Sequence, residues 1–365
     1  MNRLRELHDA GVSIWLDTLS RDLLDSGEFA KLVEKYAVSG ATSNPTIFAK
    51  AITGSDRYDD QLRSLVADGI SDLRELFFAV ALEDVRRAAA ILRPVHERTG
   101  GGDGFISFEC TPDLADDAEA TIAQAVDLWR RLDLPNVLIK VPATLAGVRA
   151  IEELTAAGVN VNVTLLFSVQ RYEEVIEAYL RGLERRAAAG DPIAGITSVA
   201  SFFVSRVDAR ADAALPPNSS LRGRVAIANA HVAYGRYLQR FAGERWEALQ
   251  DAGAAPQRPL WASTGTKDPS YSDVLYVEQL IAPGVINTMP EQTLRAFAEH
   301  GNVERALDSD PGAASAVLSD AAAEGLDLET ITSELERDGV KAFCDSYDQL
   351  LSCIESKLHS LIATP

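Results

Sequence analysis

The chain has 365 residues, of which 47% are hydrophobic and 24% charged, a balance typical of a globular protein with a sizeable core. Its net charge of -19, from 54 acidic and 35 basic residues, disfavours nucleic acid and anionic membranes as partners. The three cysteines match no zinc or disulfide pattern, the five histidines are widely spaced, and no apolar run suits a signal peptide or membrane span. We therefore expect a cytoplasmic protein with no catalytic metal. We also expect no cofactor, and a monomer or a homodimer, between which the sequence does not decide.

Short apolar runs rich in β-forming residues alternate along the chain with longer amphipathic stretches. The stretches 120–132 and 170–190, for example, have the apolar spacing expected of helices. This alternation predicts βαβ units with a parallel sheet, and eight such units favour closure into a (β/α)8 (TIM) barrel. The predicted strands cover residues 13–17, 39–43, 105–109, 136–141, 159–165, 195–202, 259–264 and 284–289.

Two helical segments exceed what a simple barrel needs. The connection at about 45–104 is too long for one crossover and contains a strong helical stretch at 71–100. The segment at about 290–365 is also helical, and its residues 328–362 should pack back on the barrel. We interpret residues 1–365 as one domain with additional helices.

Lys140 stands within VLIKVPAT, an apolar run that should form a central strand. Lysine is almost never fully buried unless it is paired. Burial disfavours the ammonium form, and the neutral amine is the nucleophile that forms an imine with a carbonyl substrate. The alternative is a structural ion pair with a carboxylate, but the rarity of buried lysine favours the functional interpretation.

The next predicted strand, VNVNVTL, alternates strictly between apolar and polar residues. Asn160, Asn162 and Thr164 face one way, because successive side chains of a strand point to opposite sides. A purely structural barrel interior favours bulky branched residues, so the polar face indicates hydrogen bonds to a hydroxylated ligand. An internal polar network bridged by water is an equally good alternative.

Polar residues also stand where the early strands end. Asp17 ends the first predicted strand, Glu109 ends the third, and Asn44 follows the second within TSNPT. Barrel enzymes place their catalytic groups at the carboxyl ends of the strands. A lone aspartate there is more often a helix N-cap, but Lys140 and Thr164 extend the set to five consecutive strands, which indicates a site.

The late strands are followed by residues that suit a phosphate group. Ser201 and Arg206 lie at and after the end of the sixth strand, and Lys267 follows the seventh within STGTKDP. Barrels often bind phosphate near strands seven and eight, through bidentate arginine or the point charge of lysine. Arg206 alone is better explained by a surface ion pair, so the prediction depends on the whole set.

Taken together, these segments resemble the motif series of the transaldolases, within the class I Schiff-base aldolases. The resemblance runs from about residue 12 to 300, covers all eight predicted strands and fits best the longer bacterial type with extra helices. A single motif such as INTMP is weak evidence, whereas the ordered series at barrel-like spacing is specific. The segments are TSNPT, SFE, VLIKVPAT, NVNVTLLFS, SFFVSR, ASTGTKDP and INTMP.

The resemblance implies a role for each candidate residue. Lys140 would form the Schiff base, and Asp17 would be the general base that takes the C4 hydroxyl proton. Glu109 with Thr164 would hold a water that shuttles protons as the carbinolamine loses water. The substrate would be held at its dihydroxyacetone part by Asn44 and Asn162, at its phosphate by Ser201, Arg206 and Lys267, and by Phe203 as a pocket wall beside Glu109.

Two residues depart from the expected family pattern. Lys267 stands where some transaldolases have an arginine, and a lysine grips phosphate with less directionality. Cys110 follows Glu109 where a small aliphatic or polar residue was the natural expectation, and we interpret it as inert.

The implied reaction is transfer of a dihydroxyacetone unit from a ketose phosphate to an aldose phosphate, in the non-oxidative pentose phosphate pathway. The first alternative is a fructose 6-phosphate aldolase-like enzyme, but that relative has glutamine and tyrosine where this chain has Glu109 and Phe203. A transaldolase specialised for a longer sugar in secondary metabolism is a second alternative. A non-catalytic sugar-phosphate-binding barrel is a third, because fold does not fix function.

Overall fold

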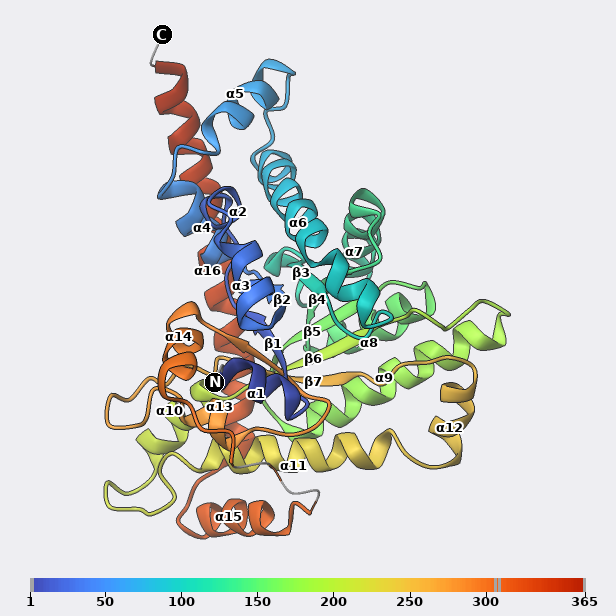
Figure 1. Cartoon of the computed structure of the whole chain (residues 1–365), viewed down its shortest axis with the longest axis vertical. Helices are drawn as coiled ribbons and strands as arrows, with labels where there is room; N and C mark the ends of the chain where they lie inside the picture. Colours follow the sequence, from blue (N-terminus) through green and yellow to red (C-terminus); the bar gives the residue numbers. More distant parts are fainter. Residues whose placement is uncertain (1–2, 305–306, 308–309, 364–365) are drawn as a thin grey trace.

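The computed structural model describes residues 3–304, 307 and 310–363, so parts of the expected C-terminal segment (305–306, 308–309 and 364–365) lie outside the described residues. Eight parallel strands close into a barrel in which each pairs with the next along the chain and β8 pairs with β1 (Figure 1). The predicted TIM barrel is confirmed, and each strand lies within three residues of its predicted limits. The strands are β1 (Ser13–Leu16), β2 (Val38–Thr42), β3 (Phe105–Glu109), β4 (Val137–Pro142), β5 (Val161–Leu166), β6 (Ser198–Phe203), β7 (Arg258–Ala262) and β8 (Ile286–Met289).

Helices surround the barrel, and additional ones lie before β1, between β2 and β3, and after β8 (Figure 1). Within the described ranges, every helix is too short or too polar to span a lipid bilayer. The helices are α1 (Arg3–Asp9), α2 (Arg21–Asp25), α3 (Glu28–Tyr36), α4 (Pro45–Thr53), α5 (Asp59–Ala67), α6 (Leu73–Arg98), the 3-10 helix η1 (Pro112–Leu114), α7 (Ala118–Leu132), α8 (Leu145–Ala156), α9 (Val169–Ala188), α10 (Ser205–Ala214), α11 (Val225–Arg240), α12 (Glu244–Asp251), α13 (Leu275–Gln279), α14 (Glu291–His300), α15 (Gly312–Ala323) and α16 (Leu328–Ala363).

Side-chain caps start several of the helices that follow strands. Ser20, Asn44, Thr144 and Ser168 each accept a hydrogen bond from the backbone N–H three residues later. Such a cap satisfies one of the free N–H groups of the first turn and fixes where the helix begins. The caps come within a few residues of the strand ends, so the connections at the mouth of the barrel are short.

The amino-terminal part of the barrel interior is filled. Trp15 is fully buried and lies against Gly40, where a Cβ would come within 2.4 Å of the indole ring. The Trp15 Nε1–H donates to Asp103 at 2.9 Å. At the amino end of β7, the Arg258 guanidinium donates to the carbonyl of Gly284 at 2.8 Å. Among the described residues, these side chains occupy the barrel interior near the amino ends of the strands, which leaves its carboxyl end for a ligand.

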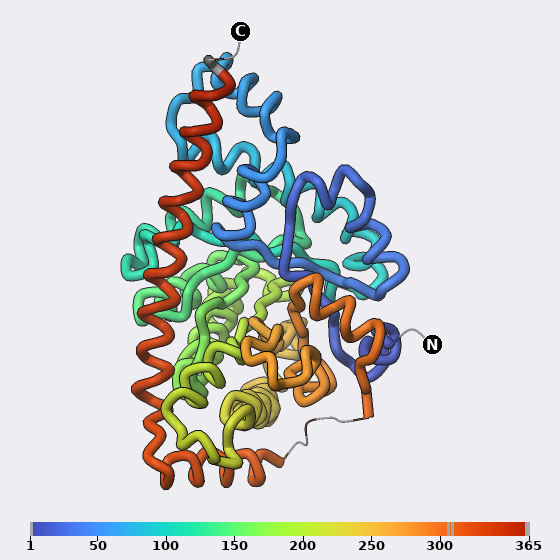
Figure 2. Tube along the Cα trace, turned by 90° about the vertical axis from the view of Figure 1, so that its left-hand side faces the viewer, coloured from blue at the N-terminus to red at the C-terminus, as the bar shows by residue number. Residues whose placement is uncertain are grey.

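The longest helix, α16, passes over the mouth of the barrel. Figure 2 shows it running along one side of the molecule, from α15 at one end to the α4–α6 segment at the other. The Thr46 hydroxyl of α4 donates to Ser346 of α16 at 2.9 Å, and Lys357 Nζ lies 2.8 Å from Asp59 of α5. The C-terminal helix therefore packs against the segments that follow β2.

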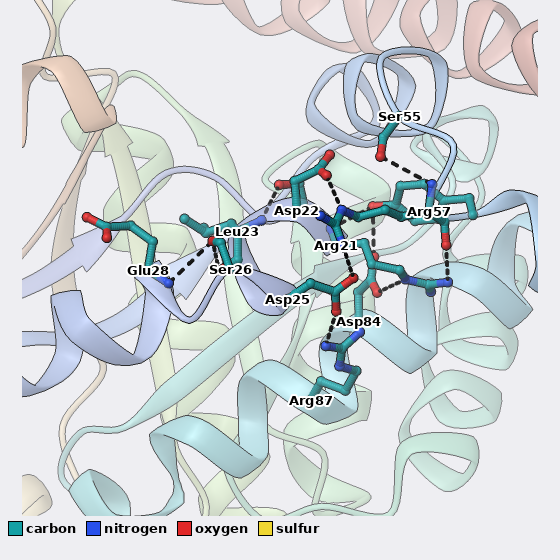
Figure 3. A network of polar contacts seen from close by, with 12 residues as sticks. Arg21, Asp22, Leu23, Asp25, Ser26, Glu28, Ser55, Arg57, Asp84 and Arg87 are labelled. Atoms are coloured by element: carbon teal, nitrogen blue, oxygen red, sulfur yellow. Dashed lines mark hydrogen bonds and ion pairs between the residues drawn. The ribbon is translucent and has the colours of Figure 1, made fainter.

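A buried ion pair ties the β1–α2 connection to α6. Arg21 Nε lies 2.9 Å from Asp84 Oδ1, and their side chains are 8% and 0% exposed. The Tyr58 hydroxyl donates to the second Asp84 oxygen at 2.9 Å and accepts the Arg21 N–H at 2.9 Å. Figure 3 shows how charged residues extend this network toward the surface, namely Asp22, Asp25, Arg57 and Arg87.

We predict that Asp84→Ala lowers the free energy of unfolding by about 3–5 kcal/mol, because Arg21 would remain buried without its counter-charge. Urea unfolding at neutral pH measures the change. The matched control is Arg63→Ala, which removes an ion pair to Asp60 between side chains that are 52% and 100% exposed. The control should lose no more than about 0.5 kcal/mol, and equal losses in the two variants would contradict the prediction.

Candidate active site

The register of β3, β4 and β5 places three polar residues side by side. Glu109 is the parallel partner of Lys140, and Lys140 is the partner of Asn162. Lys140 is 5% exposed, its Nζ lies 3.5 Å from Glu109 Oε2, and it donates to the Ser43 carbonyl at 3.1 Å. The contact with Glu109 is longer than a strong charge-assisted hydrogen bond. The amine is therefore only loosely paired.

A pocket of about 180 Å3 opens at the carboxyl end of the barrel. Most of the residues predicted for the site line it. Glu109 and Asn162 do not, but Glu109 contacts the lining residue Lys140, and Asn162 contacts the lining residue Ser201. Two threonines and one phenylalanine that the sequence did not single out also line it: Thr42, Thr288 and Phe343. The predicted residues in the lining are Asp17, Asn44, Lys140, Thr164, Ser201, Phe203, Arg206 and Lys267.

The Asp17 carboxylate is held by its neighbours on β2 and β8. The Thr42 hydroxyl donates to Asp17 Oδ1 at 2.7 Å and lies 2.9 Å from the Thr288 hydroxyl. The Asp17 N–H donates to the Met289 carbonyl at 2.8 Å. Thr42 and Thr288 were missed because each is one hydroxyl in an otherwise ordinary strand, and only the closed barrel brings them together.

Glu109 is a buried carboxyl with an unusual environment. Burial is the largest cause that raises its pKa above the ordinary value, the Lys140 ammonium opposes this, and the Asp17 charge adds to the rise. Its Oε2 and the Thr164 Oγ1 are both buried and have no hydrogen-bond partner among the described residues. A carboxyl with a raised pKa can exchange a proton nearer neutral pH, which suits a general acid or base.

The asparagines have three different environments. Asn44 caps α4 through its Oδ1, which accepts the Ile47 N–H at 3.0 Å, and it also lines the pocket. Asn162 is fully buried, donates to Ser107 at 2.8 Å and accepts from Ser201 at 2.7 Å. Asn160 binds backbone groups at the opposite end of β5, including the Thr197 N–H at 2.9 Å. Of the two alternatives left open for this polar face, the internal polar network applies to Asn160, because its polar atoms join neighbouring strands.

Two cations that border the pocket have no carboxylate partner among the described residues. The Arg206 guanidinium carbon lies 5.2 Å from the centre of the Phe203 ring, and Lys267 is exposed in the segment after β7. Neither forms an ion pair with a described carboxylate, so the surface ion pair considered for Arg206 is absent from the described part of the chain. Burial lowers the pKa of Arg206, and the Asp17 and Glu109 charges oppose this. Since the whole chain carries -19, these two cations favour an anionic ligand.

Strained backbone occurs at two points of the site. Leu165 and Ser263 have φ angles of 55° and 57°, in the left-handed region that disfavours residues other than glycine. Leu165 directly follows Thr164, and the Ser263 hydroxyl lies 2.9 Å from that of Ser205 at the start of α10. Such strain persists where surrounding contacts hold it and is common at functional sites.

A larger hollow of about 340 Å3 lies between α9, α11, α15 and α16. It contains none of the candidate residues, so size alone does not identify the site. Across the described residues, no group of three or more His, Cys, Asp or Glu side chains is arranged to hold a metal ion.

Asp208 anchors α10, the helix that carries Arg206. Its Oδ1 accepts the Ala226 N–H at 2.7 Å, and the residue is 1% exposed. Burial raises the pKa of this carboxyl to about 6, although hydrogen bonds from Ala226 and Tyr276 oppose the rise. This contact therefore joins the start of α11 to α10, the helix that carries Arg206.

The fold and the site together define a TIM barrel with a buried lysine amine in a pocket suited to an anion. The family model described as Transaldolase/Fructose-6-phosphate aldolase matches residues 14–354. Proteins named Transaldolase from Saccharopolyspora erythraea and Frankia alni are 50% and 49% identical to the chain, each over 98% of both sequences. Transaldolase 1 of Streptomyces avermitilis is 48% identical, over 98% of this chain and 96% of its own. The chain therefore belongs to the transaldolase/fructose-6-phosphate aldolase family.

We predict that Asp208→Asn changes how stability depends on pH. The folded state raises the pKa of Asp208 from 3.8 to about 6, so its stabilising effect is full below the lower value and is lost as pH rises through the higher one. The neutral asparagine has no such loss. The difference in the free energy of unfolding, variant minus wild type, should therefore be about 1.5 kcal/mol larger at pH 8 than at pH 5.

Urea unfolding at several pH values measures this difference. Asp60→Asn, at a side chain that is 100% exposed, is the control and should show no comparable trend. A constant difference between Asp208→Asn and wild type would contradict the assigned environment.

Proposed function

We propose that this protein is a transaldolase that acts through a Schiff base on Lys140. It would transfer a dihydroxyacetone unit from sedoheptulose 7-phosphate or fructose 6-phosphate to glyceraldehyde 3-phosphate or erythrose 4-phosphate. The observation that carries the proposal is Lys140 itself, a buried and loosely paired amine in a pocket shared with Asp17 and two cations. The relatives named Transaldolase, at up to 50% identity, support the same activity.

In the first half of the reaction, the ketose phosphate binds with its phosphate toward Arg206 and Lys267. The Lys140 amine attacks the ketone carbon, and the resulting carbinolamine loses water to give a protonated imine. Glu109 and Thr164 each have a buried oxygen with no hydrogen-bond partner in the described part of the chain, and they would hold the water that relays protons in this step.

Carbon–carbon cleavage then depends on Asp17. Its carboxylate, oriented by Thr42, takes the proton of the C4 hydroxyl, and the C3–C4 bond breaks as its electrons move into the imine. The leaving aldose phosphate departs, and a three-carbon enamine stays on Lys140. The same steps in reverse, with a different aldose phosphate, complete the transfer.

Glu109 and Phe203 favour transfer over simple cleavage. The fructose 6-phosphate aldolase-like alternative uses glutamine and tyrosine at these positions, so that a phenol takes part in proton transfer. This chain has a carboxyl and a ring without a hydroxyl there, which supports a transferase.

We further propose that the enzyme acts in the cytoplasm, in the non-oxidative pentose phosphate pathway. The cysteines Cys110, Cys344 and Cys353 are free thiols, in keeping with a reducing compartment. Sugar phosphates are its expected ligands, and the monomeric or homodimeric state stays a prediction.

We predict that borohydride reduction in the presence of fructose 6-phosphate leaves a three-carbon adduct on Lys140. Peptide mapping by mass spectrometry locates the adduct. Lys140→Met should give none, whereas Lys50→Met, which removes an exposed lysine, should behave as wild type. An adduct on another lysine, or no adduct on wild type, would overturn the proposed mechanism.

We predict that Lys267→Ala lowers kcat/KM for fructose 6-phosphate by about 10- to 100-fold, because a hydrogen bond to a charged group is lost. Steady-state kinetics with erythrose 4-phosphate as acceptor measure the change. The value for unphosphorylated fructose should change little, and Lys267→Arg should retain most of the activity on the phosphorylated donor. Equal losses for the two donors would show that Lys267 does not bind the phosphate.

A further inference from the structure

The inner face of α16 contacts the site at positions one helical turn apart. Gly339, Phe343 and Tyr347 are spaced by four residues and so lie on one face of the helix. A Cβ at position 339 would come within 2.9 Å of Leu165 Cδ2, and Leu165 directly follows Thr164. The helix backbone therefore lies close to the end of β5.

The next two residues of this face border two cavities. Phe343 lines the pocket that contains Lys140, and Tyr347 lines a cavity of about 10 Å3 that also borders Glu109. Phe343 is 6% exposed and Tyr347 is 3% exposed. A cavity of this size is at the lower limit of what one water molecule needs. One face of α16 thus encloses both the amine and the carboxyl proposed to act on the substrate.

Contacts on both sides of Phe343 hold α16 in place. Toward its amino end, Glu336 lies 3.4 Å from Arg171 of α9, with side chains that are 22% and 18% exposed. Toward its carboxyl end, Ser346 accepts from Thr46, and Lys357 lies 2.8 Å from Asp59. The Phe343 ring is therefore a fixed part of the pocket wall.

Phe343 differs from the other residues of the pocket in origin, and from most of them in chemistry. Every other lining residue belongs to a barrel strand or to the segment directly after one. Most of them offer charges, hydroxyls or amides, whereas the Phe343 ring has no polar atom. The ring cannot form hydrogen bonds with the hydroxyl or phosphate groups of a sugar phosphate, and it occupies space that water would otherwise fill.

We propose that Phe343 keeps solvent water from the three-carbon enamine on Lys140 and thereby sets the ratio of transfer to release. This inference rests on the proposed transaldolase function. Release requires solvent at two points: the terminal enamine carbon takes a proton, and water then adds to the iminium carbon. The carbon–nitrogen bond breaks next, which frees dihydroxyacetone and returns the Lys140 amine. In transfer the enamine carbon bonds to the acceptor aldehyde instead of taking a proton, and water is needed only afterwards, to hydrolyse the product iminium.

Phe343→Ala tests the inference. With fructose 6-phosphate as the sole substrate, the variant should release free dihydroxyacetone faster. The ratio of this release rate to the transfer rate with erythrose 4-phosphate should be about tenfold or more higher than in wild type. Such a change corresponds to about 1.4 kcal/mol in the difference between the barriers to release and to transfer. Phe343→Leu, which keeps most of the bulk, should give a smaller rise.

The matched control is Leu350→Ala, which removes a fully buried side chain from the same helix outside the pocket. It should keep the wild-type ratio even if stability falls. An unchanged ratio in Phe343→Ala, or an equal rise in Leu350→Ala, would overturn the inference. Should Phe343→Ala fail to fold, an unchanged ratio in Phe343→Leu would overturn it equally.

Borohydride trapping on wild type separates failure of this inference from failure of the proposed function. A Lys140 adduct together with an unchanged release ratio contradicts the role of Phe343 alone. The absence of any Lys140 adduct contradicts the transaldolase mechanism and the inference built on it.

Discussion

The pairing of Glu109 with Lys140 across β3 and β4 is the constraint on which the site depends. Parallel register puts the two residues at the same level, and burial makes both charges costly unless they stay close. Burial raises the pKa of Glu109, the Lys140 charge counters that rise, and a separation of 3.5 Å leaves the amine loosely held. One strand register therefore provides a candidate nucleophile together with a candidate proton carrier.

The rest of the barrel confines this pair to one opening. Trp15 fills the interior below Asp17, on the same face of β1, and α16 passes over the carboxyl ends of the strands. Between them lies a pocket with two cations, although the chain as a whole carries -19. The positive charge is thus concentrated where a phosphate group would bind, and the acidic surface repels anions elsewhere.

Much of the polar machinery has a structural duty as well. The Asn44 side chain both lines the pocket and caps the start of α4 through its oxygen. Asp208 anchors the helix that carries Arg206. Ser263 has a left-handed backbone conformation, and its hydroxyl contacts the Ser205 hydroxyl, which joins the end of β7 to the start of α10. The geometry of the site is therefore maintained by the same contacts that start the helices around the mouth of the barrel.

The sequence alone determined the strand–helix alternation, the barrel, and a lysine in an apolar strand, because period-two and helical patterns are local properties of the chain. Its ordered motifs also indicated most of the pocket residues. Tertiary structure decided that Asn160 joins neighbouring strands, that Thr42 and Thr288 orient Asp17, and that Phe343 lines the pocket. These contacts join segments far apart in the chain, and no local pattern specifies them; barrel closure and the path of α16 bring them together.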